Sequence, residues 1–117
     1  MHEFSLMQNV LTTVEKTANQ SGARCVTEVR LAIGEMAEVV ADAMQFAFEA
    51  LTLGTICEGA TLNIETVPTR SRCVQCGHEF THDRYQWTCP KCASLATELI
   101  SGREMYISSI EIEEKND

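Results

Sequence analysis

The chain has 117 residues and a formal net charge of −8, with 44% hydrophobic and 6% aromatic residues. This length predicts one domain, or a small domain with a metal-held appendage, and the apolar content suffices for a modest core. The acidic charge argues against a nucleic-acid-binding protein, because phosphate contacts rely on clustered Lys and Arg. It suits a basic protein partner or a cationic metal cargo, but many intracellular proteins are simply acidic.

The chain begins with the pattern of an amphipathic helix. Apolar residues recur at helical spacing up to Ala18, and the polar run that ends at Gly22 should stop the helix. Ser5 and Gln8 have the spacing of a capping box, so we expect Ser5 to cap this helix. On this prediction, residues 1–3 lie just outside the helix and leave the amino terminus free.

Three extended segments and a second helix should follow. Residues 24–33 and 60–67 have the pattern of strands, and residues 37–53 place apolar side chains at helical spacing. In the first strand, Cys25, Thr27 and Val29 should share the buried side. Residues 99–113 form a third extended segment, bent at Ser101-Gly102. A bulge at Ser108-Ser109 would keep its apolar residues on one side.

Two Cys-x-x-Cys pairs lie before this third segment. Cys73 and Cys76 form the first pair, Cys89 and Cys92 form the second, and twelve residues separate the two pairs. Two turns that each present two thiolates can close on one tetrahedral ion, and zinc with four thiolates has no open position for catalysis. The region is too short and too polar to fold by itself, so metal binding should supply its folding energy. The pattern predicts a structural zinc ribbon with tight bends at Gly77 and Pro90.

The predicted fold is α+β, a three-stranded sheet with two helices on one face and an inserted four-cysteine zinc-ribbon subdomain. We assign residues 1–68 and 98–117 to the helix–sheet domain and residues 69–97 to the zinc-binding subdomain. Inserted subdomains often move relative to their host, because few contacts cross the boundary.

Other interpretations of the cysteines stay open. Disulfides would suit a secreted domain, but the opening Met1-His2-Glu3 is no secretory leader and no long apolar stretch exists, so we expect an intracellular protein with reduced thiols. An iron centre, as in a rubredoxin-like electron carrier, would use the same ligands. A zinc-ribbon adaptor for nucleic acid or a protein complex would also explain them. It predicts a basic stripe, however, and only four basic residues lie near the ribbon.

Four further cysteines and histidines need an interpretation. Cys25 should occupy a buried core position, since free cysteine is among the most buried residue types. Cys57 lies in a loop and is a candidate reactive thiol, although nothing near it in the sequence supplies a base. His78 and His82 flank the ribbon and either pack on it or tune the zinc site. The sequence has no phosphate-binding glycine loop and no nucleophile beside a base, so we expect no enzyme.

The first three residues form a second candidate metal site. The terminal amine of Met1, the amide nitrogen of His2 and its imidazole can close two chelate rings on one ion. Planar nitrogen ligands suit Ni(II) or Cu(II), and an octahedral alternative adds the Glu3 carboxylate or waters. The plain alternative is an exposed histidine on a mobile terminus. Such a site would be open enough to release its ion, and its affinity should fall in acid because the ligands must be deprotonated.

The opening Met1-His2-Glu3 together with the paired cysteines resembles the HypA/HybF family of hydrogenase nickel-incorporation proteins. The resemblance spans essentially the whole chain. Its further parts are Leu31-Ala32-Ile33-Gly34-Glu35, Phe46-x-Phe48-Glu49, Glu58-Gly59-Ala60 and Ser108-Ser109-Ile110-Glu111-Ile112.

This resemblance implies a cytoplasmic nickel metallochaperone that carries Ni(II) as transient cargo for [NiFe]-hydrogenase maturation, and in some relatives also for urease. It implies nickel at His2 and Glu3 with the terminal amine of Met1. It implies structural zinc at the four paired cysteines. The implied partners are the nickel-loading GTPase HypB and the hydrogenase large-subunit precursor, with no nucleic acid and no membrane, and a homodimer is also allowed.

Overall fold

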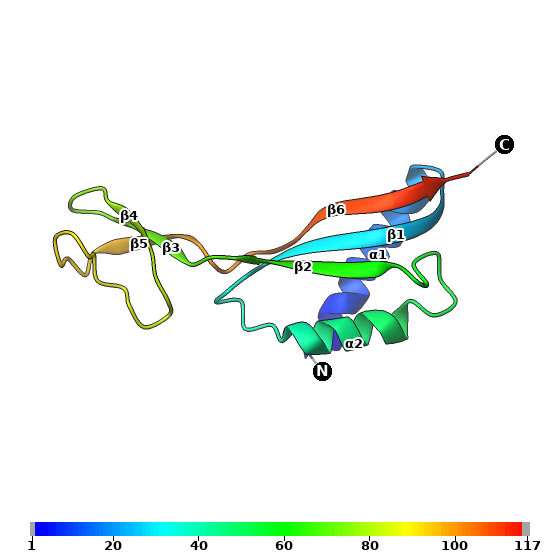
Figure 1. Ribbon diagram of the computed structural model, residues 1–117, viewed down its shortest axis with the longest axis horizontal. Helices are drawn as coiled ribbons and strands as arrows, with labels where there is room; N and C mark the ends of the chain where they lie inside the picture. The colour runs from blue at the N-terminus through cyan, green and yellow to red at the C-terminus, as the bar shows by residue number, and fades with distance from the viewer. Residues whose placement is uncertain (1, 116–117) are drawn as a thin grey trace. The chain divides into compact units, whose positions relative to one another are not determined.

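The computed structural model describes residues 2–115, which form two helices and two three-stranded sheets (Figure 1). This is the predicted α+β class. The helices are α1 (His2–Gln20) and α2 (Ala41–Leu51). The first sheet has the strand order β2-β1-β6, from β1 (Ala23–Gly34), β2 (Thr61–Val67) and β6 (Met105–Glu114). The second has the order β4-β3-β5, from β3 (Arg70–Cys73), β4 (Glu79–Thr81) and β5 (Thr97–Ser101).

The chain divides into two compact units. Among the described residues, the first unit comprises 2–31, 39–64 and 107–115, and the second comprises 32–38 and 65–106. The first unit therefore holds both helices, and the second holds the whole β4-β3-β5 sheet. The second unit extends beyond residues 69–97 on both sides. Neither α1 nor α2 is long and apolar enough to cross a membrane.

The core of the first unit comes from the apolar stripes that the sequence predicts. α1 buries side chains at helical spacing, and α2 packs against it through its own stripe. The fully or nearly fully buried apolar residues are Met7, Val10, Leu11, Val14, Ala18, Ala23, Val26, Val29, Leu31, Met44, Ala47, Phe48, Cys57 and Leu62. None of these core residues belongs to the paired cysteines.

The predicted start of the first helix is wrong, because α1 already includes His2 and Glu3. Ser5 is an exposed residue inside the helix and does not cap it. The Glu3 carboxylate accepts hydrogen bonds from its own backbone N–H and from the Val40 N–H, the latter at 3.2 Å. An acidic residue in the first turn also suits the positive end of the helix dipole. The first turn is therefore stabilised both by its own backbone and by the distant Val40.

The second helix is shorter than predicted. It begins at Ala41, because Glu38 has a left-handed φ of 57° and Val40 is extended. It ends at Leu51, and the Thr52 hydroxyl donates a hydrogen bond of 2.8 Å to the Phe48 carbonyl. These local conformations interrupt an apolar pattern that continues on both sides of the helix.

The predicted phase of β1 is wrong at its start and right from Val29 onward. Val26 is buried, whereas Thr27 is exposed and donates its hydroxyl to the Glu111 carbonyl at 3.2 Å. Cys25 is half-buried, with its Sγ 3.7 Å from the Glu113 carboxylate, so it is no core residue. The more apolar Val26 takes the interior position, and the strand changes phase before Val29.

The third predicted extended segment is two strands in two different sheets. β5 pairs antiparallel with β3, and β6 joins the first sheet after Gly102, whose φ is 129°. Ser108 and Ser109 are both exposed, and the half-buried positions resume at Ile110. This is the phase shift that was expected at the two serines.

Candidate metal centres

The structure brings the four paired cysteines together. All four Sγ atoms lie within 4.8 Å of one another, with 3.5 Å between Cys73 and Cys92 and 3.7 Å between Cys76 and Cys89. Four sulfurs placed tetrahedrally about 2.3 Å from a zinc ion would lie about 3.8 Å apart. The donor set and its spacing therefore fit one zinc ion with no position left for substrate.

Both cysteine pairs use the same turn. The Gly77 N–H donates to the Cys73 carbonyl, and the Ala93 N–H donates to the Cys89 carbonyl, each at 2.9 Å. Both donors are left-handed, with φ of 76° at Gly77 and 63° at Ala93. The sequence predicted the bend at Gly77, but it pointed to Pro90 for the second turn. Glycine adopts this left-handed conformation freely, whereas for alanine it costs about 1 kcal/mol or more in conformational free energy.

The turns direct backbone N–H groups at the sulfurs. Those of Cys76 and Gln75 lower the pKa of Cys73 to about 6, although burial opposes this. Burial also acts to raise the pKa of Cys89, but other backbone N–H groups of its turn lower the pKa overall. At Cys92, the Ser94 N–H favours the thiolate, yet hydrogen bonds among the sulfurs and burial raise its pKa to about 12. The cluster readily gives up some protons, but it resists holding four negative charges unless a cation neutralises them.

The interior side of the cluster is packed and its outer side is open. Cys73 and Cys89 are buried with Phe80, whereas Cys76 and Cys92 are exposed. The rings of His78 and His82 both lie near the Phe80 ring, with centroid distances of 6.1 and 5.2 Å. Neither histidine belongs to the metal-ligand group found among residues 2–115.

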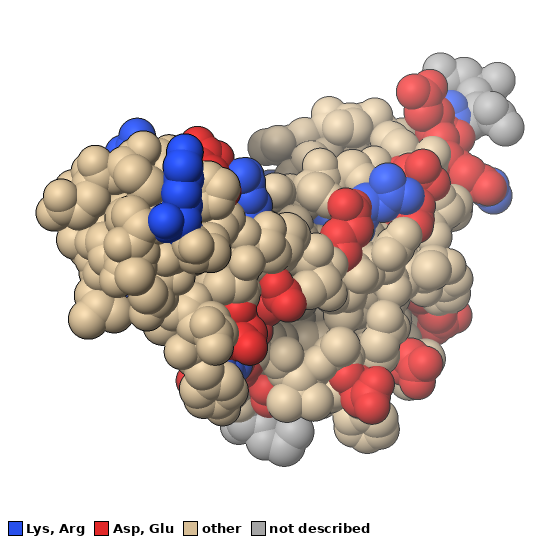
Figure 2. All heavy atoms as spheres, turned by 60° about the vertical axis from the view of Figure 1, so that its left-hand side comes forward, with Lys and Arg blue, Asp and Glu red and all other residues tan. Residues whose placement is uncertain are grey.

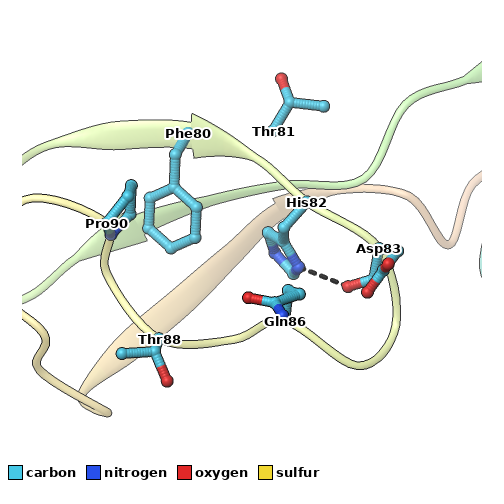
Figure 3. A pocket seen from close by; sticks show the side chains of 7 residues that line it. All are labelled: Phe80, Thr81, His82, Asp83, Gln86, Thr88 and Pro90. Carbon is cyan, nitrogen blue, oxygen red and sulfur yellow. Dashed lines mark hydrogen bonds between the residues drawn. The ribbon is translucent and has the colours of Figure 1, made fainter.

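His82 instead ties the loop after β4 to β3, beside a cavity of about 260 Å³ (Figure 3). Its Nε2 lies 2.7 Å from the Ser71 hydroxyl, and its Nδ1 lies 2.6 Å from the Asp83 carbonyl. A carbonyl only accepts, so Nδ1 carries a proton, and the Nδ1–H tautomer of imidazole accepts from the Ser71 hydroxyl at Nε2. Ser71 is fully buried, which keeps its hydroxyl from any substrate. Sequence reasoning missed this pair, because nothing local links residues eleven positions apart.

The predicted nickel ligands lie in the first turn of α1. The side chain of His2 is 63% exposed and that of Glu3 is 16% exposed, with 3.9 Å between His2 Nδ1 and Glu3 Oε2. Hydrogen bonds from the backbone N–H groups of Glu3 and Val40 lower the pKa of the Glu3 carboxyl. The third predicted ligand, the terminal amine of Met1, lies outside the described residues. An exposed imidazole beside a carboxylate held by hydrogen bonds can bind a cation and still leave it accessible to solvent.

The backbone adds one more feature to this amino-terminal pair. The first four N–H groups of an α-helix have no partner within the helix. The amide nitrogen of His2, the first residue of α1, is therefore not committed to the helical ladder. This leaves it available as a nitrogen ligand next to its own imidazole.

The remaining thiol outside the cluster, Cys57, is fully buried. It has no exposed surface, and burial raises its pKa to about 11, with the Glu15 carboxylate adding to the effect. A thiol with so high a pKa carries little thiolate at neutral pH. Cys57 therefore lacks the exposure and the low pKa that favour a reactive loop cysteine.

An α+β fold with a closed cluster of four thiols and an open histidine–carboxylate pair at one helix start defines a small metal-binding protein. The family model described as "Hydrogenase/urease nickel incorporation, metallochaperone, hypA" matches residues 1–112. The chain belongs to this HypA family, as its sequence features indicated.

Two curated relatives cover nearly the full length of the chain. The hydrogenase maturation factor HypA of Geobacter metallireducens is 43% identical over 113 residues, which cover 97% of this chain and 100% of the relative. HypA of Dehalococcoides mccartyi is 36% identical over 116 residues, covering 99% of this chain and 98% of the relative.

Two solved structures share the fold. The solution structure of the Ni metallochaperone HypA from Helicobacter pylori has a TM-score of 0.68 and 25% identity, covering 97% of this chain and 98% of its own. A second solution structure of a HypA protein has a TM-score of 0.75 and 26% identity, and the match covers 98% of both chains. The fold and the hydrogenase-maturation family are therefore shown together.

Proposed function

We propose that this protein is a nickel metallochaperone, which binds Ni(II) at its amino terminus and delivers it for the maturation of [NiFe]-hydrogenase, and also of urease where that enzyme is present. The observation that supports this most directly is the pair formed by His2 and Glu3, 3.9 Å apart in the first turn of α1. The terminal amine of Met1 and the His2 amide nitrogen complete the proposed ligand set. This set leaves the ion open to transfer.

Zinc has a different proposed role in the same chain. Cys73, Cys76, Cys89 and Cys92 would hold it as a permanent structural ion, since four sulfurs complete its preferred coordination. Zinc would neutralise the crowded thiolates and fix the two turns. We therefore assign zinc binding to residues 69–97, and nickel binding to the helix–sheet domain of residues 1–68 and 98–117.

The ion pairs of the ribbon region support a protein partner rather than nucleic acid. Three of its arginines each have an acidic partner, namely Arg70 with Glu79, Arg72 with Glu98 and Arg84 with Glu38. On the face drawn in Figure 2, other side chains separate the Lys and Arg residues, so they form no continuous stripe. A phosphate backbone would have to compete with these carboxylates.

The proposed partners follow from the family. We propose that the chain acts in the cytoplasm, receives or passes Ni(II) together with the GTPase HypB, and delivers the ion to the hydrogenase large-subunit precursor. A homodimer would be compatible with this role. The chain itself is proposed to carry no catalytic step, so energy for transfer would come from the GTPase.

The decisive experiment is nickel titration of untagged, zinc-loaded protein by calorimetry, with metal analysis before and after. His2→Ala should abolish Ni(II) binding and leave one zinc per chain, because it removes the imidazole and nothing in the core. His78→Ala is the matched control, since it removes a histidine outside the proposed nickel site, and it should bind nickel as wild type. Micromolar Ni(II) affinity that survives in His2→Ala would refute the assignment.

A variant with an extended amino terminus tests the terminal amine. A few residues added before Met1 move the charged amine away while His2 and Glu3 stay in place. A lower affinity and a changed Ni(II) absorption spectrum are expected. Unchanged affinity and spectrum would remove the amine from the ligand set but leave the His2 assignment standing.

A further inference from the structure

Helix α2 is more apolar than its place in the core requires. Eight of its eleven residues are apolar, and the three polar ones are Asp42, Gln45 and Glu49. Only Met44, Ala47 and Phe48 are buried within the helix. A helix that is apolar on more than its core-facing stripe is normally covered on a second side.

The surplus apolar residues lie on the outward side of α2. Phe46 is 64% exposed, and Leu53, just after the helix, is 70% exposed. They are seven residues apart, which is about two helical turns or roughly 10 Å along one side. With Val40, at 58%, they are all the large exposed apolar side chains among the described residues of the first unit. The apolar surface of this unit is therefore concentrated at one helix.

The charged side chains on this surface of α2 have a single sign. Asp42 and Glu49 are exposed on the same side of α2 as Phe46 and Leu53. The sequence has no Lys, Arg or His from Leu31 to Thr69. A second copy of this chain would place carboxylates opposite carboxylates, which disfavours self-association through this side. Lys or Arg beside an apolar stripe would complement it.

We propose that the α2 outer face, defined by Asp42, Phe46, Glu49, Ala50 and Leu53, is a docking surface for an amphipathic helix of a protein partner with Lys or Arg beside its apolar stripe. Apolar side chains of the partner, spaced by seven residues, would contact Phe46 and Leu53 across the small Ala50. Its cations would meet Asp42 and Glu49. Such helix-on-helix recognition depends on a few apolar anchors and gains specificity and association rate from the charges.

The test uses a defined probe, a synthetic Leu/Lys peptide of about five helical turns with leucines at helical spacing. NMR titration of ¹⁵N-labelled, zinc-loaded protein should shift the signals of residues 42–53 first. Phe46→Ser combined with Leu53→Ser should weaken binding about tenfold or more, and Glu49→Lys should weaken it severalfold. Both variants change exposed side chains, so circular dichroism and zinc content should stay as wild type.

Three controls separate this proposal from general attraction to an acidic protein. A Leu/Glu peptide of the same pattern and a scrambled Leu/Lys peptide should both bind at least about tenfold more weakly. Glu111→Lys makes the same charge change on β6, outside the α2 outer face, and should change the affinity less than about twofold. Shifts centred on β6 or the ribbon would overturn the proposal, as would equal binding of both leucine-patterned peptides or no binding at all.

Two last measurements test whether a second copy of the chain covers the α2 outer face and whether this face is separate from the proposed nickel site. Sedimentation of wild type and of Phe46→Ser/Leu53→Ser should give the same oligomeric state. If wild type formed a dimer that this double variant lost, the occupant of the α2 outer face would be a second copy of the chain and not a partner helix. The same variant should bind Ni(II) as wild type. Failure of peptide docking therefore leaves the nickel function intact, and failure of nickel binding leaves the docking surface intact.

Discussion

The two candidate metal sites differ in what holds their ligands in place. In the cysteine cluster, the ligands come from two turns thirteen residues apart, and two of the four sulfurs are buried. At the start of α1, adjacent residues supply the ligands, and His2 is mostly exposed. Gathering distant thiolates makes the fold depend on the ion, whereas neighbouring ligands on a preformed helix can gain and lose an ion with little change in structure.

The supporting structure differs in the same way. The first unit has an apolar core drawn from two helices and a sheet, whereas the cysteine ligands of the second unit lie in a small cluster of buried residues, formed by Cys73, Phe80 and Cys89. Two of these three core residues are themselves proposed zinc ligands. The region that most needs an ion for stability thus has little else to hold it together.

The largest expected effect comes from Cys73→Ser, which removes a buried ligand. Structural zinc contributes roughly 10–16 kcal/mol to small zinc peptides, and a missing thiolate forfeits much of that. We expect less than one zinc per chain and collapse of ribbon NMR signals, with α1 and α2 still folded. Cys25→Ser is the matched control, because it changes a half-buried thiol outside the cluster. Loss of the helical circular dichroism signal in Cys73→Ser would show that the metal also maintains the first unit.

Phe48→Ala tests whether the first unit depends on its apolar core and not on the metal ion. Phe48 is 2% exposed, so its truncation should cost about 3–5 kcal/mol of unfolding free energy through lost burial and a cavity. Denaturant unfolding followed by circular dichroism measures this cost, and metal analysis should still find one zinc. Phe46→Ala makes the same substitution two residues away at an exposed position, where a change within about 0.5 kcal/mol is expected. An equal loss of unfolding free energy in the two variants would mean that Phe48 is not the buried side chain and Phe46 the exposed one.

The features that could be predicted from the sequence are those set by local chemistry. The cysteine cluster was predicted because ligand spacing is a local pattern, and the helices because apolar stripes repeat every three or four residues. The start of α1 was missed because Glu3 makes its hydrogen bond with Val40, 37 positions away. The pairing of β5 with β3 and the His82–Ser71 bond are equally non-local. The left-handed conformation of Ala93 was missed because alanine gives no sign of it.

Ala93 offers a smaller test within the cysteine cluster. It holds the position in the second turn that Gly77 holds in the first, at a cost of about 1 kcal/mol for a left-handed alanine. Ala93→Gly should remove this strain from the folded state. Because glycine also increases the conformational entropy of the unfolded chain, the net stabilisation should be at most about 1 kcal/mol. Gly77→Ala should show the opposite sign. Competition with a zinc chelator measures both, and destabilisation by Ala93→Gly would mean that the two turns are not equivalent.

The smallest expected effect is the pH dependence of Glu3. Because hydrogen bonds lower the pKa of its carboxyl in the folded state, ionised Glu3 stabilises the fold above its unfolded-state pKa, and this contribution is lost as pH falls through the folded value. Glu3→Gln should therefore be slightly less stable than wild type at neutral pH, and the difference should vanish in acid. Glu49→Gln, an exposed substitution on α2, provides the control for lost charge.

Nickel titration of the same variant separates two roles of Glu3. If the carboxylate only stabilises the first turn of α1, Glu3→Gln should keep the nickel affinity of wild type, since glutamine can still accept the Val40 N–H. If it also binds the ion, the affinity should fall while the zinc content stays unchanged. We expect the second result, because Glu3 Oε2 lies 3.9 Å from His2 Nδ1, so one ion could be bound by both side chains. The first result would confine the proposed nickel site to nitrogen ligands and sharpen its contrast with the sulfur cluster.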